Sequence, residues 1–146
     1  MSAPEPAPSP GRLLVAVTRA HRAVFDAGLA PLGLRVGQEM VLLGVGAEDG
    51  LSQANLTRTL GVERATVSKA LSRLERSGFV RRERTGPTTR VWLTEKGWRA
   101  LPTARALWSR IDALVAESAG PDESAMVAAL ERVLTALKAV GAEEPS

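Results

Sequence analysis

The sequence predicts a mainly α-helical fold that carries one small β-hairpin. Apolar residues recur at three- and four-residue steps through most of the 146-residue chain, which is the period of an amphipathic helix. Between residues 80 and 93 this period gives way to two short extended segments separated by Gly86-Pro87, which is typical of a hairpin. A chain of this length has room for one domain.

The composition is that of a soluble globular protein. Apolar residues make up 45% and charged residues 24% of the chain, which is too apolar for a disordered protein. No run of about 18 apolar residues is present that would span a bilayer. The first residues, MSAPEPAPSPGR, contain no hydrophobic segment resembling an export signal, so we expect a cytoplasmic protein.

The residues that catalysis or metal binding would require are scarce in this sequence. Cysteine is absent and His21 is the only histidine, which nearly excludes disulfides, thiolate chemistry and the usual nitrogen-and-sulfur metal sites. No Gly-rich phosphate loop or serine-containing elbow accompanies His21, which we expect at the surface or in an interface. We therefore predict that the chain is not an enzyme and holds no metal or cofactor.

The N-terminal third predicts two helices. Residues 1–10 and 142–146 have little to bury and are predicted to be terminal tails. A first helix is expected over residues 11–27, ended by Gly28 and Pro31, and a second over residues 36–45. The apolar positions of the first helix are Leu13, Leu14, Val17, Ala20, Val24 and Phe25.

A helix-turn-helix is predicted over residues 51–77. Ser52 stands where an N-cap belongs, at the start of a short helix that ends near Leu60, and Gly61 supplies the turn. The following helix, residues 63–77, places its apolar positions within about one third of its circumference. These positions are Val67, Ala70, Leu71 and Leu74.

The opposite face of this helix is basic and rich in hydroxyl groups, and Glu75 is the only acid among its middle and late positions. Guanidinium, ammonium and hydroxyl groups on an exposed helix face suit the major groove of DNA, where they reach base edges. We therefore predict that it is the recognition helix. The residues of this face are Arg64, Thr66, Ser68, Lys69, Ser72, Arg73 and Arg76.

The hairpin is predicted from strands 80–84 and 89–93, and it carries Arg81, Arg82, Arg84 and Arg90. These arginines are expected to contact phosphates or enter a minor groove, which would make the hairpin a wing. The alternative is that they keep the edge of the hairpin soluble.

Side-chain alternation within the second strand gives a further expectation. If Val91 and Leu93 face the core, Trp92 points away from it. We expect Trp92 to cover the neighbouring strand or the following helix rather than to contact a ligand or DNA. Thr94 is placed to cap that helix.

Charge is distributed unevenly along the chain. Residues 51–99 hold 11 Lys or Arg against four Asp or Glu, whereas the remainder holds eight against 12. A basic middle between acidic ends favours contact with a polyanion.

The C-terminal third predicts two long helices separated at Gly120-Pro121. Their apolar stripes are suited to receive another helix, either from a second copy or, alternatively, from the same chain. The first stripe contains Leu101, Ala104, Leu107, Trp108, Ile111, Leu114 and Val115, and the second contains Met126, Ala129, Leu130, Val133, Leu134, Leu137 and Val140.

Residues 51–97 resemble the DNA-binding core of MarR-family transcriptional regulators. The resemblance rests on a short polar helix ending in Leu-Gly, a Thr-Val-Ser helix, Leu-Glu-Arg-Ser-Gly-Phe-Val, an Arg-rich hairpin and Leu-Thr-Glu-Lys-Gly. Gly33-Leu34, Gln38 and Leu42 also fit. The hairpin is shorter than is usual, Gly86–Arg90 stands in place of the Asp-Arg-Arg motif, and Thr57 stands where Ala is common.

The resemblance implies a winged helix-turn-helix with N- and C-terminal dimerisation helices. It implies a single domain over residues 11–141, with residues 35–99 as the DNA-binding core and residues 11–30 and 100–141 as dimerisation helices. It also implies a homodimer that acts as a repressor and responds to a small aromatic effector. The predicted dimerisation residues are Leu13, Val17, Leu107, Ile111, Leu114, Val133 and Leu137.

A dimer of this kind would read a pseudo-palindromic operator, with its recognition helices about 34 to 36 Å apart. The alternative is a winged-helix module that binds an acidic protein partner through its basic face. Absent cysteines argue against the thiol-oxidation sensors of the family. The predicted DNA-binding residues are Ser52, Gln53, Arg64, Thr66, Ser68, Lys69, Ser72, Arg73, Arg76, Arg82, Arg84 and Arg90.

Overall fold

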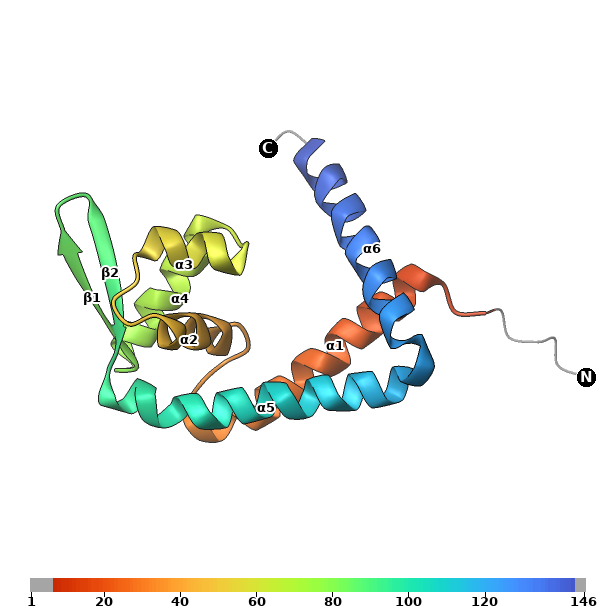
Figure 1. Cartoon of the computed structure of the whole chain (residues 1–146), viewed down its shortest axis with the longest axis horizontal. Helices are drawn as coiled ribbons and strands as arrows, with labels where there is room; N and C mark the ends of the chain where they lie inside the picture. Colours follow the sequence, from red (N-terminus) through yellow and green to blue (C-terminus); the bar gives the residue numbers. More distant parts are fainter. Residues whose placement is uncertain (1–6, 144–146) are drawn as a thin grey trace, which may run out of the picture. The chain divides into compact units, whose positions relative to one another are not determined.

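A computed structural model describes residues 7–143, and it confirms the predicted fold class of helices with one β-hairpin (Figure 1). The predicted tails lie largely outside the described residues, at residues 1–6 and 144–146. The chain divides into two compact units, and the boundary lies between Leu107 and Trp108. The elements are α1 (Pro10–Leu29), α2 (Gln38–Ala47), α3 (Gln53–Leu60), α4 (Arg64–Arg76), β1 (Val80–Thr85), β2 (Thr88–Leu93), α5 (Glu95–Ala119) and α6 (Glu123–Glu143).

Helix α1 is longer than predicted at both ends. It begins at Pro10, because Ser9 acts as its N-cap and accepts a hydrogen bond from the Arg12 N–H. It also runs through Gly28, so the prediction that Gly28 ends the helix was wrong. A Cβ at Gly28 would lie 2.8 Å from the side chain of Leu107, so this glycine permits close packing inside the unit. A 3₁₀ turn, Ala30–Leu32, follows the helix.

Helices α2, α3 and α4 pack against one another and against the hairpin. Helix α2 begins two residues later than predicted, after Gly37, whose φ of 95° lies in the left-handed region. Gly61 forms the predicted turn between α3 and α4 with a φ of 63°. Together α3 and α4 are the predicted helix-turn-helix.

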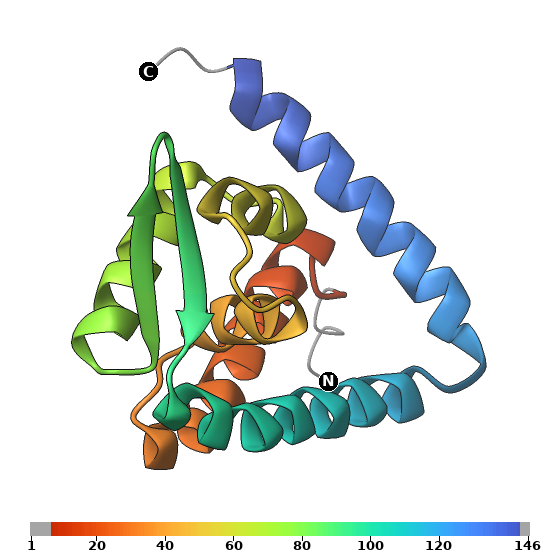
Figure 2. The same cartoon turned by 60° about the vertical axis from the view of Figure 1, so that its left-hand side comes forward.

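Strands β1 and β2 form an antiparallel hairpin in which Val80 pairs with Leu93 and Thr85 pairs with Thr88. The hairpin lies beside α4, and its tip points away from the start of α5 (Figure 2). The predicted capping by Thr94 is confirmed, because its Oγ1 accepts a hydrogen bond from the Gly97 N–H at 3.2 Å.

The core of the first unit explains why α3, α4 and the hairpin hold together. Three of the four predicted apolar positions of α4 are buried, and Ala70 is half-buried. Fully buried aliphatic side chains of this kind supply most of the favourable free energy of folding. The largest side chains with almost no exposure are Phe25, Leu29, Leu42, Val45, Leu56, Val67, Leu71, Leu74, Phe79, Val80 and Val91.

The second unit consists of the end of α5, the predicted break at Gly120 and helix α6. No residue of α6 is buried, although the helix carries an apolar stripe along its length. Its large exposed apolar side chains are Val127, Leu130, Val133, Leu134, Leu137 and Val140.

The predicted dimerisation residues separate into two groups. Leu107 and Ile111 are already buried within the single chain, so both leave little surface for an interface. Leu107 packs over Gly28 of α1 in the same chain. The other five, Leu13, Val17, Leu114, Val133 and Leu137, keep between 41 and 59% of their surface exposed.

None of the helices within residues 7–143 combines the length and the apolar character that crossing a membrane requires.

Candidate nucleic-acid interface

Helix α4 presents a sharply divided surface. Val67, Leu71 and Leu74 are buried, whereas Arg64, Lys69, Arg73 and Arg76 are exposed. The two sets alternate at helical spacing, so burial of one side fixes the other toward solvent. The predicted assignment of the two faces is therefore confirmed in the structure.

The exposed surface of α4 consists of three strips. At 100° per residue, Lys69 and Arg76 lie directly opposite the buried stripe. Ser72 and Glu75 lie toward the hairpin, where both contact Arg82. On the other flank, Thr66 and Arg73 line a cavity that also involves α1 and α2.

The four exposed cations of α4 are not neutralised by nearby acids. Within residues 7–143 the structure shows no ion pair to Arg64, Lys69, Arg73 or Arg76. Arg76 makes a long hydrogen bond from its Nε to the Ser72 carbonyl, 3.5 Å away. These charges therefore remain available to an anionic partner.

The start of α3 adjoins the same surface. The Ser52 hydroxyl accepts a hydrogen bond from the Asn55 N–H at 3.1 Å, which confirms the predicted N-cap. Ser52 and Gln53 line a cavity of about 350 Å³ together with Arg64 and residues 87–89 of the hairpin turn and β2. Both predicted α3 contacts thus lie near the wing and the start of the recognition helix.

The hairpin arginines have different environments. Arg84 lies exposed near the tip, and its Nε donates to the Gly86 carbonyl at 3.2 Å. Arg90 is exposed too, but its Nη1 donates to the Gly50 carbonyl at 2.9 Å, which ties β2 to the segment before α3. Arg81 stacks over Trp92 at 4.2 Å from the ring centroid, so Trp92 covers its neighbouring strand as predicted.

Arg82, which the sequence predicts as a DNA contact, forms its polar contacts inside the chain in this structure. Its side chain is only 21% exposed, and its Nη2 donates to Glu75 at 3.2 Å and to Ser72 at 3.0 Å. Ser72 shares this engagement, since its hydroxyl also donates to the Ser68 carbonyl. The sequence signal that could have revealed the pair is Glu75, the one late acidic residue on a basic face.

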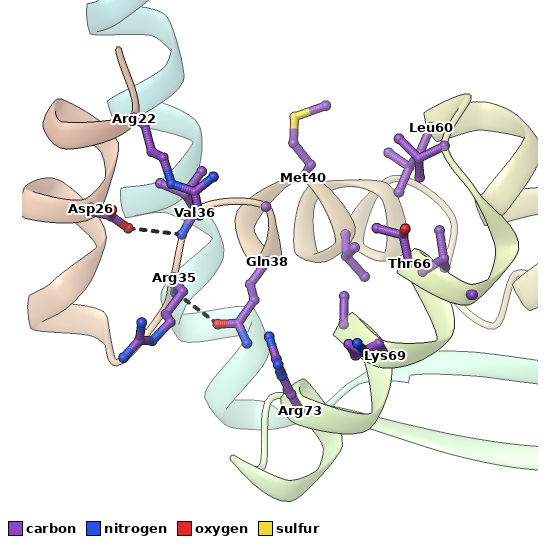
Figure 3. A pocket seen from close by; sticks show the side chains of 16 residues that line it. Arg22, Asp26, Arg35, Val36, Gln38, Met40, Leu60, Thr66, Lys69 and Arg73 are labelled. Carbon is purple, nitrogen blue, oxygen red and sulfur yellow. Dashed lines mark hydrogen bonds between the residues drawn. The ribbon is translucent and has the colours of Figure 1, made fainter. Parts of the chain in front are cut away.

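A cavity of about 520 Å³ opens on the flank of α4 (Figure 3). Four cationic residues line it, against the single acid Asp26, whose Oδ1 accepts from the Val36 N–H at 3.3 Å. The Gln38 side chain accepts from the Arg35 N–H at 2.9 Å, which holds the loop before α2 in place. The cations are Arg22, Arg35, Lys69 and Arg73, and the larger apolar residues are Val36, Met40, Val41, Leu60, Val62 and Val67.

Glu39 was not identified from the sequence, yet its side chain is buried behind this loop. Its Oε2 accepts from the Gly37 N–H at 2.7 Å, next to two residues that line the cavity. Burial raises the pKa of Glu39 above its ordinary value of 4.5, while its hydrogen bonds to backbone N–H groups partly oppose the rise.

The exposed His21 packs its ring against Phe25, with 4.7 Å between the centroids. Across residues 7–143 no three His, Asp or Glu side chains gather as a metal site would require.

Comparisons with known proteins agree with this geometry. A family model described as MarR family matches residues 32–90. The HTH-type transcriptional regulator TtmR of Methylorubrum extorquens (strain PA1) is 39% identical over 82 residues, which are 54% of this chain and 40% of that protein. The chain spans between 33 and 61% of the length of the curated relatives that it matches.

The solved structures are matched over a larger share of their length than the curated relatives are. The PcaV transcriptional regulator of Streptomyces coelicolor, in complex with its natural ligand, has a TM-score of 0.71 at 25% identity, covering 92% of this chain and 97% of that one. The S. aureus MepR–DNA complex has a TM-score of 0.77 at 21% identity, covering 88% of this chain and 96% of that one, which shows the shared fold. Residues 32–90 thus match the MarR family of transcriptional regulators, a family of DNA-binding proteins that are not enzymes, and solved transcriptional regulators share the fold of about nine tenths of this chain.

Proposed function

We propose that the chain acts as a homodimeric repressor that binds a pseudo-palindromic DNA operator and responds to a small aromatic effector. The observation that carries DNA binding is the exposed face of α4, where four cations have no acidic partner among the described residues. Because DNA carries a dense line of phosphates, such a face gains affinity by displacing the counterions bound to them.

Each part of the interface has a distinct role in this proposal. Lys69 and Arg76 enter the major groove with α4, where such side chains reach guanine acceptors. Arg64 and the start of α3 contact phosphates. Arg84 at the hairpin tip contacts the adjacent backbone or minor groove.

A footprint on the DNA upstream of the gene tests this proposal. Protection is expected at two half-sites whose centres lie about one helical turn, 10 to 10.5 base pairs, apart or a multiple of it. A scrambled duplex of equal length serves as the control. Equal binding to both duplexes would exclude a specific operator, and an absence of duplex binding would favour the alternative of an acidic protein partner.

The homodimer is supported by exposed apolar side chains on α1 and α6. Leu13 and Val17 of α1 are exposed, and so are Val133 and Leu137 of α6. Exposed aliphatic groups spaced along a helix favour association, because burial of apolar surface is the main driving force of stable interfaces. A two-fold dimer would place two copies of α4 on one duplex.

The effector is supported by the cavity beside α4. Its volume of about 520 Å³ is in the range of small-molecule sites, and its lining combines aliphatic walls with guanidinium groups. In this proposal the aromatic ring contacts aliphatic lining residues such as Met40 and Val62, and a carboxylate substituent pairs with Arg22 or Arg35. Since Lys69 and Arg73 belong to both the cavity and the recognition helix, a bound anion there competes with DNA for the same charges.

Benzoate and its hydroxylated derivatives are suitable probes of the cavity. They are expected to raise the melting temperature and weaken DNA binding, whereas neutral benzyl alcohol should do neither. The variant Arg35→Gln keeps the α4 cations, so it should bind DNA normally but lose its response to benzoates. An undiminished response in Arg35→Gln, in Arg22→Gln and in the double variant would place the ligand elsewhere.

A further inference from the structure

Glu75 occupies a position that electrostatics disfavours twice. It lies in the last turn of α4, where the helix dipole favours cations, and it borders the face that would meet DNA phosphates. Its side chain is 40% exposed, so the charge is not hidden from a bound duplex. A carboxylate in this place requires a compensating role.

The compensation is visible in the contacts with β1. The Glu75 Oε2 accepts from the backbone N–H of Arg82 at 3.0 Å, and its Oε1 accepts from the Arg82 guanidinium at 3.2 Å. One carboxylate thus holds both the main chain and the side chain of the same wing residue. The Arg82 Nη2, which donates to Glu75, also donates to the Ser72 hydroxyl at 3.0 Å, one turn earlier on α4.

The register of the hairpin explains why this backbone group is available. Arg82 pairs with Val91, whose N–H points out of the hairpin and donates to the Leu51 carbonyl at 3.0 Å. In an antiparallel pair of this kind, the N–H groups of both residues point outward. The N–H of Arg82 therefore lies on the free edge of β1, and without Glu75 it would depend on water.

We propose that Glu75, Arg82 and Ser72 form a latch that fixes the wing relative to the recognition helix, with Glu75 as a positioning residue for DNA binding. The latch rests on the proposed DNA-binding function. It holds β1 against α4, so Arg84 at the tip approaches a duplex at the same time as Lys69 and Arg76. Arg82 then orients the wing without itself contacting phosphate.

Glu75→Ala should change DNA affinity in opposite directions, depending on whether Glu75 forms the latch or is only a charge at the surface. Removal of a repelling carboxylate beside DNA would strengthen binding, whereas release of the wing would weaken it. We expect Glu75→Ala to lower DNA affinity about fivefold to tenfold, from the loss of partly exposed charge-assisted hydrogen bonds. The matched control is Glu83→Ala, since Glu83 is an exposed hairpin acid that pairs only with exposed Arg81 in the described residues. It should change affinity less than about twofold.

The dependence of affinity on salt separates positioning from direct contact. Arg82→Met should weaken binding, and it should reduce the slope of log K against log salt by no more than loss of the Arg84 contact does, because Arg82 itself makes no phosphate contact. In the Arg84→Ala background, Arg82→Met should therefore leave the slope unchanged. Arg84→Ala should reduce that slope by about 0.9 for each wing, which is about 1.8 for the proposed dimer. Arg84→Ala should also lower DNA affinity less in the Glu75→Ala background than in the parent, because a released wing no longer holds Arg84 against the duplex.

Amide hydrogen exchange gives a readout that does not require DNA. The Arg82 N–H should be protected in the parent protein and exchange rapidly in Glu75→Ala, while the Val91 N–H stays protected in both. Stronger DNA binding by Glu75→Ala, a further reduction of the salt slope when Arg82→Met is added to Arg84→Ala, or unchanged exchange at Arg82 would overturn the latch. If the parent binds no duplex but exchange at Arg82 responds, the proposed function fails while the structural latch stands.

Discussion

Truncation of Leu71 tests whether the buried side of the recognition helix has been identified correctly. Leu71 has no exposed surface and lies on the face of α4 that packs on α2 and α3. Leu71→Ala removes three carbon atoms, worth about 2.4 kcal/mol of transfer free energy, and leaves a cavity that adds to the cost. The expected loss is about 3 to 4 kcal/mol, which lowers the melting temperature by about 10 °C.

The control lies two residues away on the opposite face. Lys69→Ala removes an exposed side chain, so its free energy of unfolding should stay within about 0.5 kcal/mol of the parent value. Its DNA affinity should fall at least about fivefold, the low end for losing a base or phosphate contact. Urea unfolding at one fixed protein concentration compares the variants, since the stability of the proposed dimer would depend on concentration. A destabilised Lys69→Ala beside a stable Leu71→Ala would refute the assignment of faces.

Three further predictions concern the rest of the chain. Because burial raises the pKa of Glu39, its folded form binds a proton more tightly than the unfolded chain, so this group's contribution to stability is lost as pH rises above about 4.5 through the folded pKa. The melting temperature of Glu39→Gln should therefore rise relative to that of the parent as the pH increases. A difference between the two melting temperatures that stays constant from pH 4 to 8 would contradict this. Val133→Asp with Leu137→Asp should yield monomers by sedimentation at concentrations where the parent is dimeric; intact dimers would exclude α6 from the interface. Gly97→Ala should be strongly destabilised, because its Cβ would meet the Phe79 carbonyl oxygen; a parental melting temperature would contradict that contact.

Local sequence signals predicted the elements whose causes are local. Ser52 and Gly61 predicted the two ends of α3, the first as an N-cap and the second as a left-handed turn, and the structure has both. Gly86-Pro87 marked the hairpin turn, and α4 followed from aliphatic spacing alone. The Ser9-Pro10 pair was an equally local signal for the start of α1, and it was overlooked.

The errors arose where the cause is tertiary. Gly28 looked like a helix end because glycine weakens helices, but its absent side chain makes room for Leu107, 79 positions later. The pairing of Arg82 with Glu75 was also not predicted, because the two residues belong to different elements. Burial of Glu39 depends on the loop that folds over it, and no periodicity reveals that. In each case the deciding contact joins residues that only the folded chain brings together.

The salt dependence of duplex binding tests the central claim most directly. The measurement is fluorescence anisotropy of a labelled duplex from the gene's own upstream region, titrated with protein between 50 and 200 mM salt. If the dimer neutralises six to ten phosphates through α4, α3 and the wing, affinity should fall by about 10³ to 10⁵ over this range. An affinity that does not change with salt would contradict recognition of DNA by the cationic face of α4.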